Sequence, residues 1–190
     1  MNAGWELPVS AEIGGKKYGL NCDYRDVLEI FSYFSDPDLP DYIKWQIALA
    51  LFFEGEIPMP HQQQAMEYLS WFLAGGRQET EAAGPRLLDW EQDRDLIAAD
   101  MNRVAGMEIR AQPYLHWWTF LSFFHAIGEG QLSTVVAIRS KLARGKKLEN
   151  WEKEFYRENK HRVDLKKRYS QQELQHQAQL EKMLHSRDER

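Results

Sequence analysis

Apolar residues recur at helical spacing along most of the chain. From Asp23 onward they fall three and four positions apart within successive segments, and stretches rich in Gly, Pro, Asp and Ser separate these segments. The pattern therefore predicts helices over residues 23–34, 40–51, 61–74, 89–105, 113–128 and 132–142.

The same spacing predicts which face of each helix is buried. Asp23 is suited to cap the first helix, because its side chain can accept a hydrogen bond from a free backbone N–H. The apolar positions of that helix are Val27, Ile30, Phe31 and Phe34. Those of the second are Ile43, Ile47, Ala50 and Leu51. Those of the third are Ala65, Met66, Leu69, Phe72 and Leu73.

Residues 9–20 follow a different period. Val9, Ala11 and Ile13 alternate with polar residues, and the alternation resumes after Gly14-Gly15. A two-residue glycine turn between alternating segments is typical of a β-hairpin. Two strands alone are marginally stable, so this hairpin is expected to pack against helices.

Residues 113–128, PYLHWWTFLSFFHAIG, carry the densest group of aromatic side chains. At 100° per residue these side chains surround almost the whole helix, which predicts a central helix buried on most sides. The segment is too short and too interrupted by polar residues to cross a bilayer, which takes about 20 apolar residues. The predicted structural core includes Trp90, Trp117, Trp118, Leu121 and Phe124.

We therefore expect a mainly α protein: a multi-helix bundle with a small N-terminal β-hairpin and an extended charged helical C-terminal tail. The expected parts are an N-terminal arm (1–22), a helical body (23–145) with a loop at about 75–87, and the tail (146–190). Residues 1–138 hold 9 Lys/Arg and 20 Asp/Glu, a balance of −11, whereas residues 139–190 hold 15 and 9, a balance of +6. A basic tail on an acidic body indicates either a partner-binding segment or a solvated Lys-rich helix.

Two apolar stripes in the tail are candidate contact surfaces. The candidate partner-binding residues are Leu148, Trp151, Phe155, Leu180, Met183 and Leu184. The first stripe either packs back on the body or contacts a partner, and the second lies in a helix that a capping box at residues 170–173 would open. With few large apolar groups, the tail is expected to be the least firmly attached part of the molecule.

Composition excludes several classes of protein. The single cysteine, Cys22, rules out an internal disulfide and a cysteine-based zinc site, and it fits a reducing cytoplasm. The first residues lack a charged segment followed by an apolar one, so no secretory leader is expected. An apolar fraction of 43% is enough for a sizeable core.

The acidic segment 89–95 is the main candidate for chemistry. Its carboxylates, with Asp100 further on, could hold a divalent metal or serve as an acid/base pair. Carboxylates in a first helical turn are more simply explained by the helix dipole, at roughly 0.3–1 kcal/mol each. We favour the dipole and keep a metal-dependent enzyme as an alternative.

Other catalytic arrangements are not evident. His116 and His125 lie nine residues apart, which places them on opposite sides of a helix, so they cannot share one metal. No nucleophile elbow, phosphate-binding loop or dinucleotide fingerprint occurs. No catalytic, metal or cofactor residue is therefore predicted.

The basic segment 139–168 has a nucleic-acid interpretation. It holds 12 basic and 5 acidic residues among aromatic side chains, a composition that can bind single strands. The glutamates alternate with the lysines and arginines at helical spacing, which weakens any field directed at phosphates. A small nucleic-acid-binding regulator therefore stays a second alternative, and a membrane partner is not expected.

Taken together, several segments resemble one family in order along the chain. They are Leu7-Pro8 and residues 13–18 (IGGKKY), 23–28 (DYRDVL), 35–39 (SDPDL), 89–93 (DWEQD), 114–120 (YLHWWTF), 138–139 (IR), 145–148 (GKKL) and 154–157 (EFYR). They cover about residues 7–165 and resemble the bacteriophage gene-product-fifteen family, whose members are taken to be tail assembly chaperones of long-tailed phages. The LHWW block after the DWEQD segment is the most specific part.

The resemblance implies a non-enzymatic role in the host cell cytoplasm, with no cofactor. Such a chaperone would coat the long helical tape measure protein, keep it soluble and recruit tail tube subunits. It would leave before the tail is complete and so be absent from the mature virion. Self-association, or association with an upstream chaperone product, would supply multivalent binding.

Overall fold

The computed structural model describes residues 5–77 and 84–176. Within this part of the chain the fold is mainly α-helical with one small hairpin, which confirms the predicted class. The elements of the first half are β1 (Ser10–Ile13), β2 (Lys16–Gly19), α1 (Tyr24–Phe34), α2 (Asp41–Phe52), η1 (Met59–His61) and α3 (Gln62–Leu73). Those of the second half are α4 (Arg94–Ala105), η2 (Ile109–Ala111), α5 (Trp117–His125), α6 (Gln131–Ala143), α7 (Asn150–Glu158) and α8 (Lys160–Val163).

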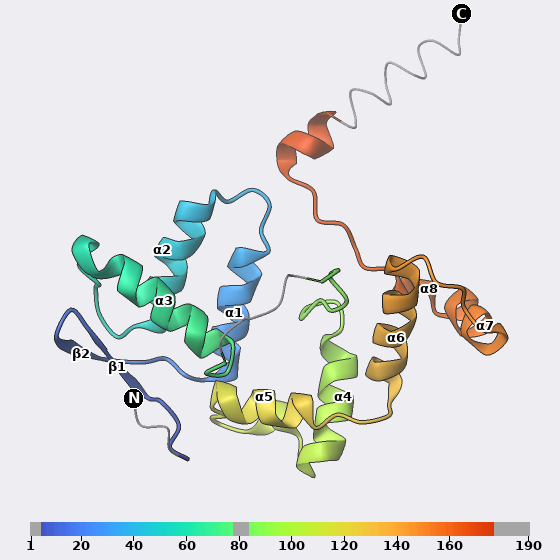
Figure 1. Cartoon of the computed structure of the whole chain (residues 1–190), viewed down its shortest axis with the longest axis horizontal. Coiled ribbons are helices and arrows are strands. Elements are labelled where there is room, and N and C mark those ends of the chain that lie inside the picture. Colours follow the sequence, from blue (N-terminus) through green and yellow to red (C-terminus); the bar gives the residue numbers. More distant parts are fainter. Residues whose placement is uncertain (1–4, 78–83, 177–190) are drawn as a thin grey trace, which may run out of the picture.

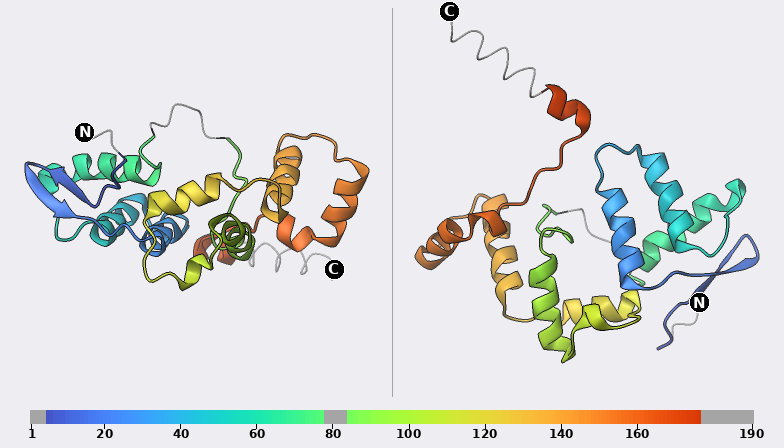
Figure 2. Two further views of the ribbon diagram at one scale, coloured as in Figure 1. Left: turned by 90° about the horizontal axis from the view of Figure 1, so that it is seen from below. Right: turned by 180° about the vertical axis from the view of Figure 1, so that it is seen from behind.

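The helices form two limbs joined at one end. Figure 1 shows the hairpin and α1 to α3 on one side, α4 and α6 to α8 on the other, and α5 lying across the lower end between them. The view from behind in Figure 2 shows the same arrangement. α5 therefore links the two limbs at one end.

The hairpin forms where the alternation predicted it. β1 pairs antiparallel with β2 in the register Ser10↔Gly19 to Ile13↔Lys16, and Gly14 (φ +59°) and Gly15 (φ +78°) make the turn. Both positions need a positive φ, which glycine adopts without the steric cost of a Cβ. The Gly14 amide also donates to the Gln64 side chain of α3, so the hairpin does contact a helix, as expected.

Asp23 caps α1 as expected and also joins two distant segments. One carboxylate oxygen accepts from the Arg25 amide at 2.9 Å, and the other accepts from the Leu115 amide at 2.9 Å. The Tyr24 amide donates back to the Leu115 carbonyl. One side chain thus fixes the start of α1 against the segment that leads into α5.

The predicted buried face of α2 was wrong. The residues that α2 buries are Ala48, Leu49 and Phe52, while Ala50 is exposed and Ile43, Ile47 and Leu51 are only partly buried. Residues 47–53 are apolar on every side, so spacing alone does not select a face. By contrast, α3 buries Ala65, Leu69 and Phe72 as predicted, and Gly75 and Gly76 end it with positive φ.

The helix expected over residues 89–105 begins five residues later, at Arg94. The Asp89 carboxylate accepts from the amides of Glu91 and Gln92, which holds residues 89–92 in a separate turn. Trp90 therefore lies in this turn and not on the helix face where the spacing placed it.

The aromatic helix is shorter and less buried than expected. α5 runs only from Trp117 to His125, and of its residues only Trp117 and Phe120 are fully buried. Tyr114, expected within the helix, lies before it and is 54% exposed. Ser122 and His125 of this helix are exposed.

The segment after residue 145 packs on the body. Val163 of α8 is buried with Val135 and Ile138 of α6, and Leu148, Phe155 and Tyr156 pack around them. This second core therefore spans the boundary placed at residue 145. Glu152 and Val163 are the fully buried residues between positions 148 and 164. That this segment is the least firmly attached part of the molecule stays a prediction, which amide exchange would test.

Candidate functional site

A groove runs between α1 and the start of α4. It consists of two adjoining cavities of about 310 Å³ and 130 Å³, which share Leu28, Trp90 and Arg94 as a common wall. The larger cavity is lined by Tyr24, Arg25, Leu28, Trp90, Arg94, Ile97, Ala98, Ile109, Arg110 and Phe120. The smaller is lined by Leu28, Phe31, Ser32, Ser35, Arg86, Leu88, Asp89, Trp90, Glu91, Arg94 and Arg168.

Aromatic rings hold the floor of the groove in place. Tyr24 stacks on Phe120 with ring centroids 4.7 Å apart and planes 10° apart. Trp90 contacts Phe120 at 6.1 Å, Trp117 at 5.9 Å and Phe124 at 5.2 Å. Such ring pairs contribute about 0.5–1.5 kcal/mol each beyond their buried area. The floor is therefore part of the main core and keeps its shape without a ligand.

Arginines supply most of the charge along the groove. The larger cavity has Arg25, Arg94 and Arg110 in its lining and no carboxylate. Arg25 is fixed by hydrogen bonds to the carbonyls of Arg110 and Gln112, at 3.2 Å and 2.5 Å. The Arg94 guanidinium lies 3.0 Å from Glu91 at the surface. This concentration of positive charge lies within the part of the chain that is acidic overall.

At the end of the groove, Asp89 is enclosed by two arginines. Arg86 and Arg168 both donate to its carboxylate, Arg168 at 3.0 Å, and Asp89 itself is 6% exposed. Burial lowers the pKa of Arg86, and the nearby charges of Arg168 and Arg139 lower it further. The carboxylate is thus fully engaged in local structure.

Asp93 forms a buried ion pair with Arg139, and their side chains are 1% and 4% exposed. The guanidinium donates twice to Asp93, at 2.6 Å and 2.8 Å, and also to the carbonyls of Leu87, Arg162 and Val163. These bonds use all five N–H donors of the guanidinium. Arg139 therefore organises the junction between the turn before α4 and the α8 segment.

Asp100 completes the set of buried carboxylates in this region. One of its oxygens accepts from the Leu132 amide at 3.1 Å, so α4 supplies a capping side chain for the start of α6. Asp95, by contrast, is exposed beside Arg94 and Arg110. Across residues 5–77 and 84–176, no group of three or more His, Cys, Asp and Glu side chains is arranged to hold a metal ion.

The two histidines of the aromatic segment have separate positions. His116 is the N-cap of α5: its Nδ1 accepts from the Trp118 amide at 3.0 Å, which leaves Nε2 to donate to the Pro8 carbonyl at 3.1 Å. Burial lowers the pKa of His116, which favours this neutral form. His125 is exposed at the other end of the helix.

The predicted core residues lie where the aromatic helix meets its neighbours. Trp117 is 1% exposed, and its indole donates to the Leu73 carbonyl at 3.0 Å. Trp118 is partly buried and donates to the Phe72 carbonyl at 2.9 Å. Trp90, Leu121 and Phe124 are partly buried and pack against the main core.

The structure separates the predicted contact residues. Leu148 and Phe155 turn inward onto the second core, whereas Trp151 is 55% exposed and donates to Glu149 at 3.0 Å. They do not form one shared outer stripe. Leu180, Met183 and Leu184 lie outside the described residues, although the capping box that precedes them is present between Ser170 and Glu173.

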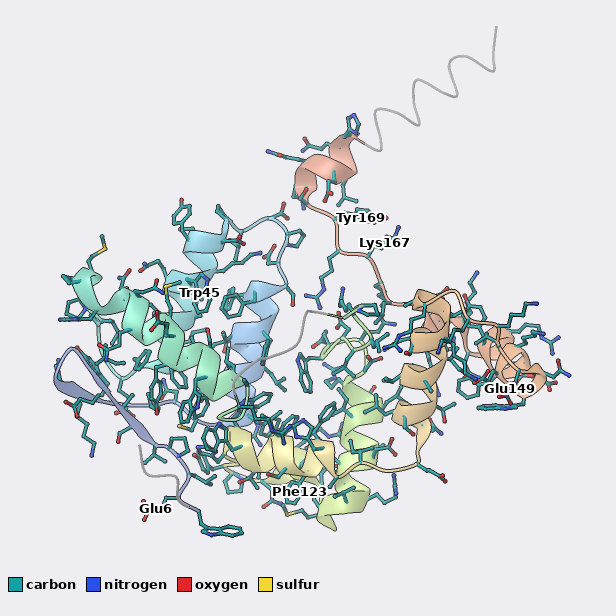
Figure 3. The ribbon with its side chains drawn as sticks, viewed as in Figure 1. Glu6, Trp45, Phe123, Glu149, Lys167 and Tyr169 are labelled. Carbon is teal, nitrogen blue, oxygen red and sulfur yellow. The ribbon has the colours of Figure 1, made fainter. Side chains whose placement is uncertain are left out.

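A wider, open cleft of about 870 Å³ adjoins the groove, between the turn before α4 and residues 161–168. Its lining mixes acidic side chains such as Glu91 and Asp95 with basic ones such as Lys166 and Lys167. Figure 3 shows Lys167 and Tyr169 on the segment that leads away from α8. The Gln171 amide, further along this segment, donates to Asp38 of the first limb at 2.7 Å.

Sequence reasoning missed both the groove and the buried arginine. Arg139 occurs four residues after Val135 and next to Ile138, on the apolar face of α6, and a charge in such a position signals a buried ion pair. The groove had no comparable signal, because its walls come from four segments between residues 24 and 120.

The fold and the groove define a small, mainly α-helical protein in which an aromatic floor is bordered by arginines. Among the described residues, no helix is long and apolar enough to cross a membrane. The chain matches the family described as Bacteriophage Gp15 protein over residues 5–165, and it belongs to that family. No match was found among curated proteins or among solved structures.

Proposed function

We propose that this protein is a non-enzymatic tail assembly chaperone of a long-tailed phage. It binds the tape measure protein in the host cell cytoplasm, keeps it soluble and helps to recruit tail tube subunits. It then leaves, and is absent from the finished virion. The observation that carries this proposal is membership of a bacteriophage family over most of the chain.

The groove supports the proposal. An apolar groove with polar borders is a common way to bind the apolar face of an amphipathic helix. Buried carboxylates at positions 89, 93 and 100 each accept hydrogen bonds from the chain itself, so they have structural roles that do not require a substrate.

The test is co-expression with the tape measure protein encoded by the same phage genome. We expect most of the tape measure protein to become soluble and to co-elute with this chain in size-exclusion chromatography. Co-expression with an unrelated long helical protein serves as the control for general solubilisation. A tape measure protein that stays insoluble, with no co-elution, would refute the proposal.

A second measurement addresses the metal-dependent alternative. We expect Mg²⁺, Mn²⁺ or a chelator to leave the melting temperature of the purified protein unchanged. A reproducible shift of several degrees would instead favour an enzyme that uses residues 89–95.

A further inference from the structure

The groove differs in charge from the surface around it. Residues 1–138 carry 20 acidic and 9 basic side chains, yet the larger cavity presents arginines alone among charged groups. The side chains of Arg25, Arg94 and Arg110 are 40%, 62% and 53% exposed. Each of them also pairs with a carboxylate outside the cavity lining, namely Asp23, Glu91 and Glu108, so an acidic ligand would compete for guanidinium groups that are accessible from solvent.

Of these arginines, Arg94 has the contacts that are most easily replaced. Arg110 is held more firmly, because it binds Glu108 with two bonds of 2.8 Å and 3.0 Å. Arg94 pairs with Glu91 and Asp95 only at the surface, where an ion pair contributes little to stability. An incoming carboxylate can replace such a contact. Arg25 is different, because its bonds to backbone carbonyls hold the wall of the groove.

The two cavities are placed in sequence along one groove. They share Leu28, Trp90 and Arg94 in their linings, so the two recesses adjoin. On a helix, residues three or four positions apart lie on the same face, one turn apart. Two large apolar side chains of one helix can therefore enter the two recesses together.

We propose that the groove between α1 and α4 binds an amphipathic, acidic helix of the tape measure protein. Apolar side chains at positions i and i+3 or i+4 of that helix fill the two cavities, and flanking Asp or Glu side chains pair with Arg94 and Arg110. This inference rests on the proposed function and names the surface and the chemistry of the contact. It places the main contact on the acidic body and not on α7.

The experiment uses the full chain and overlapping 30-residue peptides that cover the tape measure protein, with binding measured by fluorescence anisotropy. The double variant R94E/R110E reverses the charge of the groove border. R157E is the matched control, because Arg157 is 75% exposed on α7 and also pairs with a glutamate three residues away. The milder R94Q/R110Q keeps the test valid if charge reversal impairs folding, which circular dichroism would reveal.

We expect at least one acidic peptide to bind the wild-type chain, and to bind R94E/R110E at least tenfold more weakly. R94Q/R110Q should show an intermediate loss, and R157E should bind like the wild type. Replacing the acidic residues of that peptide by Lys should restore binding to R94E/R110E and weaken it to the wild type, which a purely structural effect would not do. Binding to the wild type should also weaken as salt increases.

The outcomes separate the inference from the proposed function. If the wild type solubilises the tape measure protein and binds its peptides, but R94E/R110E binds them equally well, the groove is not the contact and the function stands. If R157E loses binding instead, the contact lies on α7 and the inference is wrong. If the wild type neither solubilises the protein nor binds any peptide, the proposed function and the inference fail together.

Discussion

The two hydrophobic cores of this protein are held together by different means. The main core contains residues of the hairpin and of α1 to α5. Its aromatic members include Phe52, Phe72, Trp117 and Phe120, and each of these four side chains is less than 3% exposed. The second core has only Val135, Ile138 and Val163 fully buried. Around these three residues, Arg139 binds Asp93 and Lys141 binds the buried Glu152 at 2.6 Å.

The difference shows how a small core can be organised. Burial of an apolar side chain contributes roughly 1.5–3 kcal/mol. Three such side chains are too few to order α6, α7, α8 and the turn before α4. The guanidinium of Arg139 instead connects three backbone carbonyls and a carboxylate from separate segments. Such a pair specifies geometry more than it adds stability, because removing both charges from water has a large cost.

Replacement of Trp117 by Ala tests the main core and should have the largest effect. It removes a buried indole and leaves the Leu73 carbonyl without its donor, so the free energy of unfolding should fall by about 3–5 kcal/mol. Chemical denaturation with both far-UV and near-UV circular dichroism would measure the loss. W151A, at an exposed tryptophan, should change stability little. Equal losses in the two variants would mean that the core is assigned wrongly.

R139K tests the second core. Lysine keeps the charge but has three donors in place of five and cannot bind Asp93 with two parallel bonds. Breaking this buried arrangement should lower stability by about 3 kcal/mol or more, and amide exchange should increase mainly in α6 to α8. The control R157K should leave exchange unchanged. If exchange rises equally in α1 to α3, the two limbs unfold as one unit and the comparison fails.

D100A tests the connection between α4 and α6, with a smaller expected effect. Asp100 of α4 accepts from the Leu132 amide at the start of α6, so its loss leaves that amide without a partner. A capping change of this kind costs about 0.5–2 kcal/mol. D100N should lose less, since the amide oxygen can still accept. Equal melting temperatures for D100A and the wild type would contradict the capping role.

The smallest expected effect is a pH dependence in the main core. Burial lowers the pKa of His116 in the folded protein, so the unfolded chain binds a proton more readily. The stabilising neutral form is fully present above the unfolded pKa of about 6.5, and this stability is lost as the pH falls toward the lower folded pKa. H116N keeps an acceptor for the Trp118 amide but does not titrate. Its melting temperature should therefore fall less between pH 7 and pH 5; an identical fall would exclude His116 as the cause.

Local chemistry in the sequence determined much of this fold. Gly14-Gly15 requires a turn, Asp23 caps a helix, Gly75 and Gly76 end one, and Ser170 and Glu173 form a capping box, because each acts on backbone groups a few residues away. Where polar residues mark the solvent side, as in α3, the spacing also predicted the buried face.

The tertiary structure determined two features that the spacing of apolar residues did not predict, the buried face of α2 and the groove. Residues 47–52 of α2 are apolar on every side, so only the contacts with neighbouring helices selected Leu49 and Phe52 for burial. The groove could not be predicted from the sequence either, because Arg25, Arg94 and Arg110 come together only when α1, α4 and η2 pack around Phe120. The sequence by itself determined the helices, the hairpin and their ends. The groove and the buried ion pairs depend on distances between remote segments, which local hydrogen bonding and hydrophobic spacing do not encode.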